Sequence, residues 1–104
     1  MESKVIRGGK VAVLYSPGWG AGWSTWNADI ESFLMFDPTL VEYVENDERD
    51  RIPAYVQSVF PDAYTGGAED LSIMWITQGL QFRITEYDGS ESVEVRENIP
   101  WELA

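Results

Sequence analysis

The segment Tyr15–Asn27 combines three glycines with three tryptophans in thirteen residues. Glycine lets a backbone approach a ligand closely, and an indole ring can stack on a flat ring while its N–H donates a hydrogen bond. The segment also lies between a predicted strand and a predicted helix, where backbone N–H groups and a helix N-terminus can hold an anion. Its glycines fit neither the dinucleotide-binding pattern nor the phosphate-loop pattern, because the third glycine comes too early and no lysine follows. The sequence therefore predicts a binding loop at residues 16–26 and leaves its ligand open.

A purely structural interpretation of the same loop stays open, in which the glycines form a tight turn and the tryptophans cover the end of the sheet. We expect at least one of Trp19 and Trp23 to point outward, because the neighbouring glycines free the backbone around them. Trp26 precedes Asn27, a predicted helix cap, and is expected in the core because a hydrophobic residue at that position packs back on the helix. The residues expected to contact a ligand or partner are Ser16, Gly18, Trp19, Gly20, Gly22, Trp23, Arg83 and Tyr87.

The chain contains no cysteine and no histidine. Thiolate nucleophiles, disulfides and the commonest general base at neutral pH are therefore excluded, and carboxylates would have to serve as both acid and base. Glu86 faces Glu91 across a predicted hairpin, but their place beside the turn predicts two solvated carboxylates rather than a cation site. We expect a protein that is not an enzyme, with no catalytic residue, no metal site and no cofactor.

Eighteen acidic residues oppose seven basic ones, which gives a formal net charge of −11. Nonspecific nucleic-acid binding depends on lysine and arginine at phosphates, so direct binding to nucleic acid is not expected. The sequence has no apolar run long enough to span a membrane and no apolar signal region at its N-terminus. These features predict a soluble, cytoplasmic protein.

Residues 10–15 form a short apolar run that predicts a strand buried on both faces and hence central in its sheet. Three helices are expected after the glycine loop, the first capped by Asn27, the second by Asp37 before a proline, and the third opened by Pro53. Residues 71–77 predict a further strand.

Asp88-Gly89 is a favoured dipeptide for a two-residue type I′ hairpin turn. This turn sets Arg83 opposite Glu94 and gathers the apolar residues on one face, whereas a one-residue slip would spoil both. The cross-strand pairs expected from this register are Tyr87 with Ser90, Thr85 with Ser92, Ile84 with Val93, Arg83 with Glu94, and Phe82 with Val95. Arg83 and Tyr87 then share the outer face of the hairpin.

The order of the predicted elements is β-α-α-α-β-β-β in one domain spanning residues 1–104. This order predicts an α+β fold with a small, mainly antiparallel sheet of about four strands and helices packed on one face.

Residues 13–27, with the sequence VLYSPGWGAGWSTWN, resemble a segment of small, uncharacterised, acidic proteins of tailed bacteriophages, as do residues 82–92 and 64–68. No catalytic role comes with this resemblance. It implies an accessory, anti-defence role in the host cytoplasm, exerted by binding rather than by catalysis.

We therefore expect a non-catalytic phage accessory protein that binds a ligand or partner through the loop at 16–26. The partner would be a host defence protein or a small nucleotide-like signal that the protein sequesters. The alternative is an acidic inhibitor that mimics DNA and blocks a host nucleic-acid-binding protein, since a net charge of −11 gives a strong negative field. Homo-oligomerisation also stays open.

Overall fold

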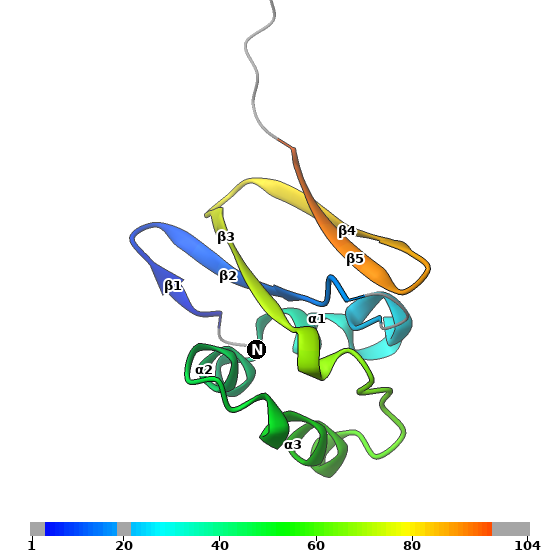
Figure 1. Ribbon diagram of the computed structural model, residues 1–104. Coiled ribbons are helices and arrows are strands. Elements are labelled where there is room, and N and C mark those ends of the chain that lie inside the picture. The colour runs from blue at the N-terminus through cyan, green and yellow to red at the C-terminus, as the bar shows by residue number, and fades with distance from the viewer. Residues whose placement is uncertain (1–3, 19–21, 97–104) are drawn as a thin grey trace, which may run out of the picture.

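The computed structural model describes residues 4–18 and 22–96 (Figure 1). Within them the chain forms three α-helices and five strands, which confirms the predicted α+β class. The elements are β1 (Ile6–Arg7), β2 (Lys10–Tyr15), α1 (Glu31–Phe36), α2 (Pro38–Glu45), α3 (Ile52–Val59), β3 (Ser72–Thr77), β4 (Gln81–Tyr87) and β5 (Ser90–Arg96), with 3₁₀ turns η1 (Ser24–Trp26), η2 (Ala28–Ile30), η3 (Arg49–Arg51) and η4 (Ala68–Asp70). The order differs from the predicted one by the added strand β1.

The strands form two antiparallel sheets instead of the single sheet that we predicted. One sheet has the order β1-β2-β3, and the other is the hairpin β4-β5. Strand β2 is central in its sheet, as predicted, because β1 and β3 pair with its two edges. Figure 1 shows the hairpin on one side of the three-stranded sheet and the helices α2 and α3 on the other.

The two-layered core explains why the hairpin does not extend the sheet. Along β2, Ala12 and Leu14 belong to a cluster with α2 and α3, whereas Val13 belongs to a second cluster with the apolar side chains of the hairpin. Strand β3 is apolar on both faces in the same way, so the sheet needs a cover on each side. The hairpin has only one apolar face, and it provides the second cover.

The helix starts follow the predicted signals only in part. The Asp37 carboxylate accepts hydrogen bonds from the Thr39 and Leu40 backbone N–H groups, which confirms the predicted cap of α2. The Tyr55 hydroxyl of α3 donates to the same carboxylate at 2.9 Å, and burial of this hydroxyl raises the pKa of Tyr55. Asn27, in contrast, caps no helix through its side chain, so that prediction was wrong.

The hairpin has the predicted register at every rung, including Arg83 opposite Glu94. Asp88 and Gly89 both have positive φ, at 51° and 86°, as the predicted type I′ turn requires. In the described part of the chain no helix combines the length and apolarity needed to cross a membrane.

Candidate functional site

The glycine–tryptophan loop is fastened to the hairpin by one buried carboxylate. The Glu91 Oε1 atom accepts a hydrogen bond from the Ser16 backbone N–H at 2.9 Å. Its Oε2 atom accepts bonds from the Trp23 N–H at 2.8 Å and the Thr25 N–H at 3.1 Å, and also from the Thr25 hydroxyl. Glu91 is only 1% exposed. The loop therefore does hold an anion through its backbone N–H groups, and that anion is the chain's own side chain.

This arrangement overturns the prediction that Glu91 is a solvated carboxylate at the hairpin tip. Its cross-strand neighbour Glu86 is exposed and accepts a bond from the Gly89 N–H instead. Ser16 is also fully buried, and its hydroxyl donates to the Gly67 carbonyl at 2.9 Å. Ser16 and Glu91 thus join the loop to its neighbours and do not face a partner.

Two glycines allow close approaches that any side chain would prevent. A Cβ atom added to Gly67 would lie 2.3 Å from the Gly22 carbonyl oxygen, so Gly67 lets the second glycine loop meet the first. A Cβ atom added to Gly22 would lie 2.3 Å from Cγ of Trp26, so the indole ring lies directly on the Gly22 backbone. Gly67 therefore allows the two loops to pack closely, and Gly22 allows the Trp26 ring to lie on the backbone.

The prediction that Trp26 lies in the core was wrong, whereas the expectation that at least one of Trp19 and Trp23 points outward is not tested, because Trp19 lies outside the described residues. Trp23 is 0% exposed, and its indole N–H donates to the Leu34 carbonyl at 2.9 Å. Trp26, expected in the core, is 44% exposed. Its ring is tilted against Tyr64, with the ring centroids 5.0 Å apart. Trp23 is thus a core residue, and Trp26 is the tryptophan that this part of the loop presents to solvent.

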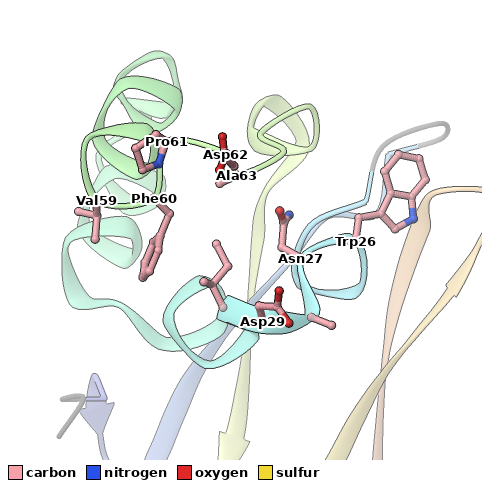
Figure 2. Close-up of a pocket in the computed structure, with 10 residues that line it drawn as sticks. Trp26, Asn27, Asp29, Val59, Phe60, Pro61, Asp62 and Ala63 are labelled. Carbon is pink, nitrogen blue, oxygen red and sulfur yellow. The ribbon is translucent and has the colours of Figure 1, made fainter.

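Trp26 stands at one end of a surface groove. A cavity of about 390 Å³ is lined by residues 26–30 and 59–63, and an adjoining one of about 350 Å³ is lined by residues 28–33 and Phe60. The two cavities share Ala28, Asp29, Ile30 and Phe60, and the surface that they line is called here the 26–33/59–63 groove. Figure 2 shows Trp26 at one side, Phe60 reaching in from the end of α3, and Asp29 and Asp62 around the opening.

The groove has an aromatic floor and an acidic rim. Phe33 packs edge-on against Phe60, with the ring centroids 5.1 Å apart, and it is stacked with Tyr55 at 6.1 Å. Val59 leaves 47% of its surface exposed at the edge. Asp29, Glu31 and Asp62 contribute carboxylates, whereas no lysine or arginine belongs to the described lining. Such a groove suits an apolar side chain with a positive charge beside it.

The two hairpin residues predicted for the site lie elsewhere. Arg83 pairs with Glu94 at 2.8 Å and lines a separate depression with Gln81 and Arg96. Tyr87 is 76% exposed near the hairpin tip. Gly18 lies against Asp70, where an added Cβ atom would be 1.9 Å from the carboxylate oxygen. Trp19 and Gly20, the remaining predicted contacts, fall outside the described residues.

The described residues include no group of three or more histidine, cysteine, aspartate or glutamate side chains arranged to hold a metal ion. Comparisons of the chain with protein-family models, curated proteins and solved structures gave no match. These comparisons assign no function to the chain.

Sequence reasoning missed the groove and the buried Glu91 for different reasons. The groove joins two segments about thirty residues apart, and Asn27 connects them by donating to the Tyr64 carbonyl and accepting from the Tyr64 N–H. No local pattern indicates that pairing. Glu91, in contrast, lies on the same face of the predicted hairpin as Val93 and Val95, because side chains alternate along a strand. The predicted register therefore already indicated that Glu91 points inward.

Proposed function

We propose that the protein is a non-catalytic accessory protein that binds a partner protein through the 26–33/59–63 groove. The observation that carries this proposal is an exposed aromatic and aliphatic groove with a wholly acidic rim in its described lining. Tryptophan and tyrosine are typical anchors at protein interfaces, and Trp26, which lines this groove, packs against Tyr64.

The charge pattern favours a basic partner segment over a nucleotide. A nucleotide needs positive charge or free backbone donors at its phosphates, and in the described part of the glycine loop the Ser16, Trp23 and Thr25 N–H groups are already bonded to Glu91. A protein segment with an apolar residue between lysines or arginines meets both the floor and the rim of the groove. The net charge of −11 would speed the approach of such a segment.

The resemblance of residues 13–27 to tailed-phage proteins supports an accessory role against a host protein during infection. It supplies a context for the partner, whereas the groove supplies the chemistry of recognition. Inhibition by mimicry of DNA would use the acidic surface without the apolar floor, and it differs from the proposal in that respect.

Selection from a random peptide library on the immobilised protein tests the proposal. The peptides recovered should carry an apolar residue flanked by lysine or arginine. Their affinity, measured by calorimetry, should fall more than tenfold, about 1.4 kcal/mol, with Val59→Lys. Ile6→Lys is the matched control, because Ile6 and Val59 are equally exposed, at 48% and 47%, and Ile6 lies on β1 away from the groove.

The control should bind the same peptides as the wild type does. Equal losses in both variants would show that the overall charge, and not the groove, governs binding, and would favour the DNA-mimic alternative. A recovered set without basic residues would contradict the proposal.

A further inference from the structure

Among the described residues, the outer edge of β3 differs from the edges of β1, β4 and β5. Strand β3 pairs with β2 on one side only. Among the described residues its backbone has no other hydrogen bond, apart from a turn bond from the Leu80 N–H to the Thr77 carbonyl. A free strand edge presents unpaired N–H and C=O groups that another strand can bind.

The edges of β1, β4 and β5 each carry a feature that discourages pairing. Strand β1 has only two residues and includes Arg7. Strand β4 carries Arg83 and Glu86, and β5 carries Glu94 and Arg96. Short length and charged side chains are the usual devices by which proteins protect sheet edges.

Strand β3 has neither device. Its six residues, SIMWIT, include no charge, no proline and no glycine, in a chain that is 24% charged. Segments of this kind have the composition typical of strands that pair with further chains. An edge of this kind can accept a further strand.

We propose that this further strand is the β3 strand of a second copy of the chain, paired antiparallel about a twofold axis. A twofold axis sets one residue of the strand opposite its own copy. Because the Gln78 N–H bonds inward to the Gly9 carbonyl, the N–H and C=O groups of Trp75 point to the free edge, and pairing centred on Trp75 sets Ser72 opposite Gln78 of the second copy. It gives a continuous six-stranded sheet, β1-β2-β3-β3-β2-β1. It forms an isologous interface, in which the same strand serves both copies.

The charges at the two ends of β3 favour this antiparallel arrangement. Glu69 and Asp70 are exposed just before the strand. At its other end, exposed Lys10 lies opposite Thr77 on the neighbouring strand β2. An antiparallel second copy brings the acidic end of one sheet to the basic end of the other, whereas a parallel one would set like charges together.

This inference is independent of the groove, which lies on other elements. It predicts a dimer in sedimentation equilibrium at physiological ionic strength, between about 1 μM and about 1 mM protein, the range of weak to moderate affinities. A monomer over the whole range would overturn the proposal and would leave the edge to a strand of another protein.

The absence of cysteine permits a direct test of the register. Ser72→Cys, at the start of β3, and Gln78→Cys, directly after its end, are made as separate single variants, both outside the two core clusters. In a mixture of the two variants under mild oxidation, a disulfide should form between them, because the two positions face each other across the twofold axis.

Either variant alone should stay uncross-linked. Like positions in the two copies would be six residues apart along the strand, about 20 Å, which is too far for a disulfide. Equal cross-linking in all three samples would indicate random collision and overturn the proposal, as would a mixture without any cross-link.

Discussion

Replacement of Glu91 by glutamine tests whether the carboxylate holds the loop on the hairpin. The amide keeps the size of the side chain but replaces one oxygen by an NH₂ group. If its oxygen takes the place of Oε2, it keeps the three donors there, Trp23 N–H, Thr25 N–H and the Thr25 hydroxyl. The NH₂ group then faces the Ser16 N–H, so two donors oppose each other.

The expected loss has two parts. A buried N–H without a partner costs about 1–3 kcal/mol. The three bonds that remain change from a charged acceptor to a neutral one, which removes roughly 1 kcal/mol each before the structure relaxes. The two parts add to about 4–6 kcal/mol, and relaxation of the neighbouring groups reduces the expected fall in the free energy of unfolding to about 3–5 kcal/mol. This is a large share of the roughly 5–15 kcal/mol typical of a domain. The melting temperature should fall by about 15 °C or more.

Glu86→Gln is the matched control, because Glu86 lies opposite Glu91 on the same rung and is exposed. Thermal unfolding followed by circular dichroism should show a change of about 0.5 kcal/mol or less in this variant. If the two variants unfold at the same temperature, the buried carboxylate does not hold the loop and the reasoning is refuted.

Three further changes test other parts of the structure by denaturant unfolding. Trp23→Ala should cost about 3–5 kcal/mol and Trp26→Ala about 1 kcal/mol, because only the first ring is fully buried; equal losses would contradict this placement. Gly67→Ala should destabilise by about 1–3 kcal/mol through overlap with the Gly22 carbonyl, and a neutral result would show that the two loops can separate freely. Tyr55→Phe should cost about 1 kcal/mol at pH 7, where the hydroxyl is protonated. The pKa of Tyr55 is raised in the folded protein, so the stability that its hydroxyl adds is fully present below pH about 10 and is lost as the pH rises through the folded-state pKa. The difference in the free energy of unfolding between wild type and Tyr55→Phe should therefore narrow at alkaline pH. A constant difference would be inconsistent with the raised pKa.

Local signals accounted for much of the fold. The Asp88-Gly89 turn fixed every rung of the hairpin, because a type I′ turn and an apolar face leave one register. The Asp37 cap followed in the same way from neighbours in sequence. The second sheet was not predicted, since only tertiary packing decides whether a hairpin extends a sheet or covers it.

The roles of the tryptophans could not be decided from the loop sequence. Glycine permits a neighbouring ring to point in either direction, so the spacing alone does not distinguish Trp23 from Trp26. The choice depends on distant partners, because Leu34 accepts the Trp23 indole N–H and Tyr64 packs against Trp26. The groove was unpredictable for the same reason, since its two sides meet only in the folded chain.

The most direct test of the proposed function is chemical-shift mapping by NMR with a library-selected peptide that carries an apolar residue between basic ones. Titration into the ¹⁵N-labelled protein should shift the backbone amide signals of the groove, at residues 27–33 and at Val59, Phe60, Asp62 and Ala63. The amides of β4 and β5 that lie far from the groove should stay unchanged. Shifts confined to the hairpin or spread evenly over the acidic surface would contradict the claim that this groove is the binding site.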